Sequence, residues 1–144
     1  MVEVEGYVFP EELYYTDDHI WVRRETDGTL TLGFDDLASK LIRTITFVML
    51  AGEGTPLMSG RVFGTVESMK WIERLKSPIS GSIKGSNTLL GTQPRLINQD
   101  PYGAGWFIRA TPTGKLNEEL SKLAHEESIA QWARKEIERR SKKP

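Results

Sequence analysis

The chain has no cysteine among its 144 residues, and this absence excludes disulfides, cysteine-based zinc sites, iron–sulfur clusters and thiol catalysis. Only two histidines are present, so a catalytic metal centre has few ligands to draw on. No Gly-rich phosphate loop, paired-histidine metal motif or Ser-His-Asp set stands in a recognisable context. We therefore expect a protein that is not an enzyme in its own right.

Long apolar runs and an excess of basic charge are also missing. No run approaches the ~20 apolar residues that span a bilayer, and the first residues lack the basic and apolar regions of a secretion signal. Lys and Arg number 19 against 20 Asp and Glu, a net charge of −1, whereas a general nucleic-acid binder carries a basic excess. These absences predict a cytoplasmic protein with no membrane or nucleic-acid partner.

Charge is balanced overall but not along the chain. Residues 1–19 carry six acidic residues and no Lys or Arg, whereas residues 134–144 carry six bases and two acids. The bases are Arg134, Lys135, Arg139, Arg140, Lys142 and Lys143. We interpret both termini as solvated, and the alternative is that the basic tail docks on an acidic partner.

The middle of the chain reads as an all-β domain, with short β-rich runs between Gly, Pro and Asp-Gly signals. Residues 19–25 and 29–34 flank Asp27-Gly28, a good hairpin turn. Further strands are expected over 45–50, 61–67, 71–76, 80–84 and 105–111. Length and composition fit one domain over residues 1–144, with 115–144 as a C-terminal helical extension.

Helical signals are fewer. Asp35 or Asp36 is expected to cap a short helix whose inner face carries Leu37, Ala38 and Leu41. Near the C-terminus, apolar residues recur at helical spacing in two segments, which predicts two amphipathic helices folded back on the β core. These residues are Leu116, Leu120 and Leu123 in the first segment and Ile129, Trp132, Ala133 and Ile137 in the second.

Residues 62–72 place one lysine in a short polar stretch between two apolar strands. A lysine at a hairpin tip is held away from the sheet by a rigid support, which is the geometry that enzymatic acylation of an amine requires. Lys70 is therefore a candidate modification site, with Glu67, Ser68 and Met69 leading into it. Taken alone, the run also fits an ordinary surface lysine in a turn.

The surrounding motifs resemble those of the glycine cleavage system H protein family. Glu67-Ser68-Met69-Lys70 is similar to its Glu-Ser-x-Lys lipoylation site, and the resemblance covers roughly residues 9–135. Three other segments match in order and spacing: Tyr15-Thr16 with His19 and Trp21-Val22, Pro78-Ile79-Ser80-Gly81, and Leu96-Ile97-Asn98-Gln99-Asp100-Pro101-Tyr102-Gly103 before Gly105-Trp106.

The last of these segments also makes sense as a turn. Pro101 fixes φ, and Gly103 and Gly105 are expected to allow backbone conformations that other residues resist. Asn98 and Asp100 are expected to cap local backbone donors. We expect Trp106 to begin a strand and fill the core, and His19 to be a structural histidine. Trp71 is either an inward-packing strand residue or an exposed ring beside the modified lysine.

The resemblance implies a mainly β fold, a flattened β-barrel of the lipoyl/biotinyl type (a barrel-sandwich hybrid). It implies lipoate amide-linked to Lys70, attached by a lipoate ligase or lipoyl transferase. The arm would carry the aminomethyl group between glycine decarboxylase, aminomethyltransferase and dihydrolipoamide dehydrogenase, and the carrier, expected to be a monomer, would supply positioning and shelter.

Several positions depart from the family pattern, chiefly Ile20, Ile42, Ala51, Trp71 and Arg95. They leave the carrier role intact but open an alternative pathway, in which an H-like carrier holds sulfur intermediates for a heterodisulfide-reductase-like complex. A biotin carrier and an unmodified interaction module are further alternatives.

Overall fold

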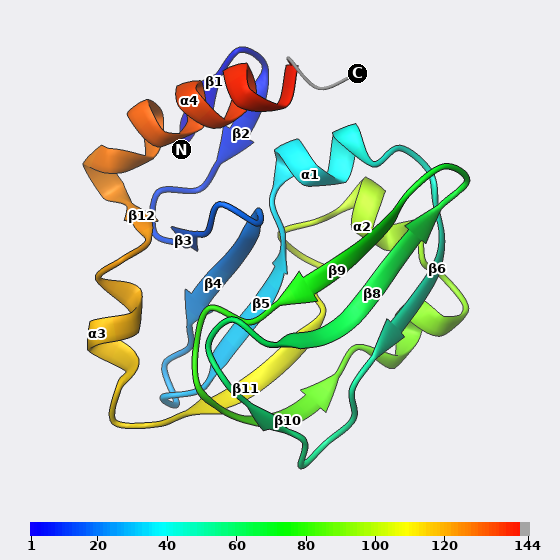
Figure 1. The fold of residues 1–144 in the computed structure, drawn as a ribbon, viewed down its shortest axis with the longest axis vertical. Coiled ribbons are helices and arrows are strands. Elements are labelled where there is room, and N and C mark those ends of the chain that lie inside the picture. Colours follow the sequence, from blue (N-terminus) through cyan, green and yellow to red (C-terminus); the bar gives the residue numbers. More distant parts are fainter. Residues whose placement is uncertain (142–144) are drawn as a thin grey trace.

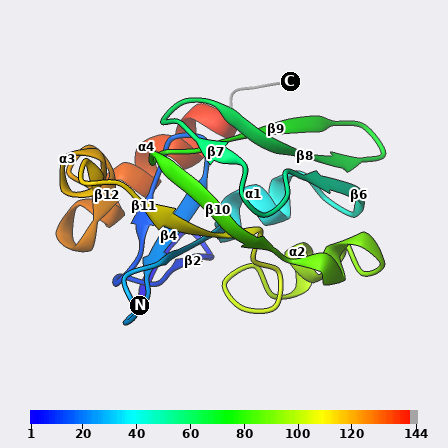
Figure 2. The same cartoon turned by 90° about the horizontal axis from the view of Figure 1, so that it is seen from below.

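The computed structural model describes residues 1–141, which form three antiparallel β-sheets and several short helices (Figures 1 and 2). The small first sheet pairs β1 (Val2–Val4) with β2 (Tyr7–Phe9). The largest sheet has the order β12-β3-β4-β5-β11-β10-β7, and the third has the order β6-β8-β9. The strands of the large sheet are β12 (Ala124–His125), β3 (Tyr14–Tyr15), β4 (Ile20–Arg24), β5 (Leu30–Phe34), β11 (Ile108–Pro112), β10 (Gly81–Ser86) and β7 (Pro56–Leu57).

The third sheet consists of β6 (Ile45–Leu50), β8 (Val62–Ser68) and β9 (Ile72–Lys76). Figure 2 shows that it packs over the large sheet, so that the two form a flattened barrel. The helices are α1 (Asp36–Leu41), α2 (Leu96–Gln99), α3 (Leu116–Leu120) and α4 (Ile129–Ser141), with 3-10 turns η1 (Thr88–Gly91) and η2 (Glu126–Ser128). The mainly β flattened barrel predicted from the sequence is confirmed.

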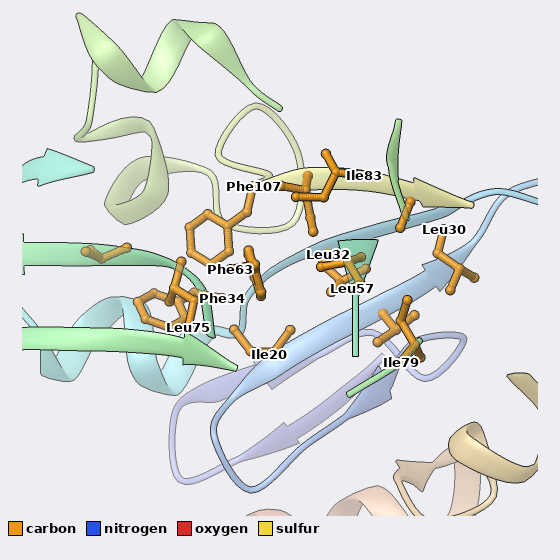
Figure 3. Packing of buried hydrophobic residues seen from close by; sticks show 14 of the residues in the cluster. Ile20, Leu30, Leu32, Phe34, Leu57, Phe63, Leu75, Ile79, Ile83 and Phe107 are labelled. Carbon is orange, nitrogen blue, oxygen red and sulfur yellow. The ribbon is translucent and has the colours of Figure 1, made fainter. Parts of the chain in front are cut away.

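The main core lies between these two sheets (Figure 3). Ile20 and Leu32 of the large sheet meet Leu75 of the third sheet, and each is at most 1% exposed. Phe107 stacks edge-on against Phe34 at 5.1 Å between ring centroids. Because burying such a side chain contributes about 1.5–3 kcal/mol, this core fixes the third sheet in place.

The predicted β4–β5 hairpin is present, and its turn depends on Asp27 and Gly28. Gly28 has a φ of 87°, a region that glycine adopts at little cost. One Asp27 carboxylate oxygen accepts hydrogen bonds from the backbone N–H of Thr29 at 3.0 Å and from its hydroxyl at 2.6 Å. These contacts set the register in which Ile20 pairs with Phe34.

Helix α1 begins as expected, with Asp35 as the cap accepting from the Ala38 backbone N–H at 2.9 Å. The expectation for its inner face is wrong in part, because Leu41 is 42% exposed. Leu37 and Ser39 are the buried residues of the helix. The chain leaves the helix after Leu41 and buries Ile42 instead, so the last apolar residue of the helix stays at the surface.

The two predicted C-terminal helices are α3 and α4. Ile129 and Ala133 of α4 are fully buried in a second apolar cluster that also contains Val4 and Phe9 of the first sheet. Helix α4 thus packs on the β1–β2 hairpin (Figure 1), a contact between the two ends of the chain that the periodicity did not predict. No helix within residues 1–141 is long and apolar enough to cross a membrane.

The segment before β11 differs from its prediction. The turn continues through Trp106, whose N–H donates to the Gly103 carbonyl at 3.2 Å, so the strand begins only at Ile108. Trp106 is partly buried in the second cluster, and its neighbour Phe107 fills the main core instead. The expectation of a core-filling strand residue at Trp106 is therefore wrong by one position.

Gly103 and Gly105 are needed because a side chain would not fit at either position. Their φ angles do not require glycine, since neither lies in the left-handed region. A Cβ at Gly103 would stand 2.5 Å from an Asp100 carboxylate oxygen, and one at Gly105 would stand 2.5 Å from the Leu96 carbonyl. Asp100 caps locally as predicted, accepting from Ala104 N–H at 2.9 Å.

Asn98 does not cap locally, and its contacts are long-range. Its amide donates to the Ser39 carbonyl at 2.9 Å and to the Arg43 carbonyl at 2.6 Å. Its side-chain oxygen accepts from the Ile45 N–H at 3.0 Å. Asn98 thereby ties α2 to the connection between α1 and β6.

Candidate functional site

The candidate lysine lies at the tip of the β8–β9 hairpin. Ser68 and Trp71 close the turn, with the Ser68 N–H donating to the Trp71 carbonyl at 2.9 Å. The Trp71 N–H donates in turn to the Ser68 hydroxyl at 3.2 Å. Only Met69 and Lys70 lie between them, and both side chains are exposed. The four residues singled out in the sequence are thus brought to one tight turn and the strand that leads into it.

The hairpin has a rigid base. Strand β8 is hydrogen-bonded on both sides, to β6 and to β9, over almost its whole length. Val66 of β8 is fully buried and Leu75 of β9 is 1% exposed, so both strands are anchored in the core. Figure 1 shows the tip projecting past the end of the sheet, beside the connection from α1 to β6. This arrangement presents the Lys70 amine to solvent on a fixed support.

Glu67 and Met69 do not shape the turn in the way Ser68 does. Glu67 is partly buried and stands in the row between Phe47 of β6 and Ile72 of β9. Met69 is 87% exposed. Of the predicted leading residues, Ser68 is the one whose side chain holds the turn.

A pocket of about 400 Å³ opens beside the tip, and the sequence did not predict it. Its lining includes Trp71 and Glu73 of the hairpin, and Leu41 and Arg43 from the end of α1 and the connection that follows it. Arg140 of α4 borders it as well. Trp71 is 52% exposed, so it is an exposed ring at the pocket rather than an inward-packing strand residue. The pocket joins segments that lie far apart along the chain, which is why no local pattern reveals it.

His19 is one of the residues that line this pocket, and it belongs to a buried ionic cluster. Its Nδ1 is 2.8 Å from an Asp35 carboxylate oxygen, and its Nε2 is 2.8 Å from a Glu136 carboxylate oxygen. Burial opposes charging the ring, but the charge and hydrogen bond of Asp35, aided by the Glu136 hydrogen bond, outweigh it and raise the pKa of His19 above its ordinary value. His19 therefore has the structural role that the sequence predicted.

Glu136 holds the other end of the cluster. Burial opposes ionisation of Glu136, but its hydrogen bonds to Arg139 and His19 prevail and lower the pKa of its carboxyl. Arg139 also donates to the Asp17 carbonyl at 3.2 Å. Part of the basic tail thus contacts the chain's own acidic N-terminal region, whereas Lys142 and Lys143 lie outside the described residues.

The comparisons with known proteins agree on one family. A family profile described as "Glycine cleavage H-protein" matches residues 13–136. The chain is 48% identical over 99 residues to the glycine cleavage system H protein of Salinibacter ruber, covering 69% of this chain and 79% of that protein. It is 37% identical over 121 residues to the corresponding protein of Mycobacterium leprae, covering 83% and 92%.

The fold is also similar to that of a solved structure from the same family. The crystal structure of a glycine cleavage system H protein from Mycobacterium marinum superposes with a TM-score of 0.70 at 34% identity. The match covers 73% of this chain and 87% of that one. Sequence motifs, fold and hairpin geometry therefore agree, and the chain belongs to the glycine cleavage H-protein family.

Proposed function

We propose that this chain is a lipoyl carrier of glycine cleavage, with lipoate joined by an amide bond to Nζ of Lys70. The observation that carries the proposal is the exposed lysine at a two-residue hairpin tip within Glu67-Ser68-Met69-Lys70. A modifying enzyme can surround such a tip without disturbing the fold, because the buried residues of the hairpin lie lower down on β8 and β9.

The residues around the tip fit a long, mostly apolar arm. The turn held by Ser68 aims the amine outward, and the pocket beside it has apolar walls in Trp71 and Leu41. Two acidic residues, Asp18 and Glu73, and two arginines, Arg43 and Arg140, also line it. When attached, the dithiolane supplies the sulfur pair that carries the transferred group. The chain's own residues would fix the attachment point, shelter the end of the arm and exclude water from it.

The carrier would be served by a lipoate ligase or lipoyl transferase and would work with glycine decarboxylase, aminomethyltransferase and dihydrolipoamide dehydrogenase. A tethered arm gives each of these enzymes a high local concentration of the reacting group, which is the carrier's contribution to rate. We also propose that the carrier acts as a cytoplasmic monomer and performs no catalysis itself. Residues 1–144 would act as one unit, with 115–144 as its helical extension.

Reconstitution with the three enzymes tests the pathway. Fully lipoylated chain, supplied as the sole carrier, is expected to support glycine-dependent NADH formation that rises with carrier concentration. Lipoylated chain that unfolds cooperatively but supports no turnover would contradict the glycine cleavage assignment. The alternative role with sulfur intermediates would then be the next to examine.

A further inference from the structure

Two large apolar side chains that line the pocket beside the hairpin tip are left partly in water by the fold. Trp71 is 52% exposed, and Leu41, the last residue of α1, is 42% exposed. Burial of such side chains is favourable, so their exposure costs free energy that an apolar occupant of the pocket would recover. The two residues come from different elements, and the pocket is what they have in common.

The Trp71 ring has no partner of its own, unlike the rings of Trp21 and Trp132. Those two donate their indole N–H groups to other residues at 3.1 Å and 2.8 Å, and both contact other aromatic rings. Within residues 1–141, the Trp71 indole makes neither kind of contact, and only the backbone of this residue is hydrogen-bonded, to Ser68. The turn therefore fixes the position of Trp71 while its ring stays uncovered.

The rest of the lining suits an uncharged occupant. Phe34, Leu37 and Ile42 line the pocket, and each is almost fully buried by the fold. The acidic residues and the arginines in the lining are equal in number, and His19 is already bonded to two carboxylates. The volume of about 400 Å³ lies within the range of about 300–1,000 Å³ that is typical of small-molecule sites. The pocket therefore offers an apolar surface and little net attraction for an ionised group.

An arm on Lys70 is the occupant with the shortest path to this pocket. Lys70 directly precedes Trp71 in the turn. Ser68 at the base of the turn pairs with Ile45, the first residue of β6, so the tip lies beside the connection that follows Leu41. The lysine side chain and the acyl chain joined to it are mainly methylenes, and a resting dithiolane carries no charge. Because the arm is covalently attached, its local concentration at the pocket is high, an advantage that a separate molecule lacks.

We propose that Trp71 and Leu41 are positioning residues that hold the resting, uncharged arm folded back into the pocket. The inference rests on the proposed carrier function, which supplies the arm. It adds that the resting carrier is closed, with the dithiolane covered, and it names the two side chains that keep it so. Attachment of the arm at Lys70 and retention of the arm by Trp71 are then separable properties.

The accessibility of the dithiolane to a small reductant tests the proposal without any partner enzyme. Fully lipoylated wild type, Trp71→Ala, Leu41→Ala and Leu89→Ala are treated with a water-soluble phosphine. The phosphine is oxidised to its oxide by water, and the disulfide takes up the two electrons and two protons to become a dithiol. The freed thiols are alkylated at timed intervals and counted by mass spectrometry. Because the chain has no cysteine, every alkylated thiol belongs to the arm.

The variants are expected to differ in the rate of reduction. Truncating a central aromatic contact weakens binding strongly, so Trp71→Ala should be reduced about tenfold faster than wild type. Leu41→Ala should be faster than wild type by a smaller factor. Leu89 is 52% exposed and lies outside the pocket lining, so Leu89→Ala should match wild type. Cooperative unfolding verifies the fold of each variant.

NMR of the wild-type chain gives a second readout that does not depend on a variant's stability. The Trp71 indole N–H signal, identified by its absence from Trp71→Ala, and the Leu41 methyl signals should shift between the unmodified and the lipoylated chain. The Leu89 methyl signals should stay in place.

Equal reduction rates in wild type and Trp71→Ala would overturn the inference. So would a Trp71 signal that lipoylation leaves unchanged, or one that moves with protein concentration, since a second copy of the chain would then cover the ring. Failure of the carrier function itself would appear as a missing lipoyl group on Lys70, before either measurement begins.

Discussion

The buried cluster of Asp35, His19 and Glu136 is expected to stabilise the fold, and Glu136→Gln tests this. His19 is 1% exposed and has a carboxylate at 2.8 Å from each ring nitrogen. A doubly hydrogen-bonded imidazolium satisfies both carboxylates, and Glu136 is contributed by α4. The substitution would leave a buried positive ring with one charged partner and would weaken the attachment of α4.

The magnitude follows from burial. Breaking a buried ion pair from one side costs about 3–5 kcal/mol. Because the amide that replaces the carboxylate retains an acceptor oxygen, and because the Glu136 side chain is 9% exposed, we expect the lower end, about 3 kcal/mol. For a chain of this length that corresponds to a fall in Tm of about 6–12 °C.

The direction of each pKa shift determines how the stability contribution of that group changes with pH. The pKa of His19 is raised from 6.5, so its contribution to the free energy of unfolding is complete below pH 6.5 and is lost as pH rises through the raised value. The pKa of Glu136 is lowered from 4.5, so its contribution is complete above pH 4.5 and is lost as pH falls through the lowered value. The cluster therefore stabilises most between about pH 4.5 and 6.5.

The assay is urea unfolding of wild type and Glu136→Gln at pH 5.5 and pH 9.5, followed by circular dichroism. Glu118→Gln, an exposed glutamate of α3, controls for the loss of one negative charge. The loss in Glu136→Gln should be largest at pH 5.5 and should become smaller as the pH rises through the raised pKa of His19, because a neutral ring can pair with an amide. A change below about 0.5 kcal/mol at pH 5.5, or an equal loss at both pH values, would refute the reasoning.

Three other substitutions probe the support of the hairpin. Ser68→Ala removes the hydroxyl that holds the Trp71 N–H, so we expect a loss of about 0.5–1 kcal/mol by thermal unfolding and slower lipoylation in a timed mass assay. Asn98→Ala removes three long-range hydrogen bonds and should cost about 2–4 kcal/mol in urea unfolding; a loss below about 1 kcal/mol would contradict its role as a tie. Gly64→Ala places a Cβ 2.5 Å from the Met49 carbonyl, and we expect it to separate β6 from β8 and cost about 1–3 kcal/mol, with faster amide exchange confined to those strands.

Local sequence signals predicted the elements that depend on near neighbours. Examples are the Asp27-Gly28 hairpin, the Asp35 cap and the tip around Lys70. Each depends on residues within a few positions of one another, so a short sequence pattern predicts it. The β1–β2 sheet and the packing of α4 against it could not be predicted in this way. They depend on burial between the two ends of the chain, for which periodicity gives no pairing information.

The same distinction explains the site. The candidate lysine and Ser68 were found from a contiguous motif, whereas the neighbouring pocket is assembled from the hairpin, α1 and α4. The structural role expected for His19 did not reveal its partner Glu136, which lies 117 residues away along the chain. The sequence predicts a local role for Asn98 because nothing in it shows that the partners lie in α1, in β6 and in the connection between them.

Peptide mass spectrometry after lipoylation tests the central claim most directly. Wild type, Lys70→Ala and Lys76→Ala, the last an exposed lysine of the same hairpin, are each incubated with lipoate, ATP and lipoate ligase. The account predicts one lipoyl group on wild type, located at Lys70, the same on Lys76→Ala, and none on a folded Lys70→Ala variant. A lipoyl group at another residue, or its persistence in Lys70→Ala, would contradict the account.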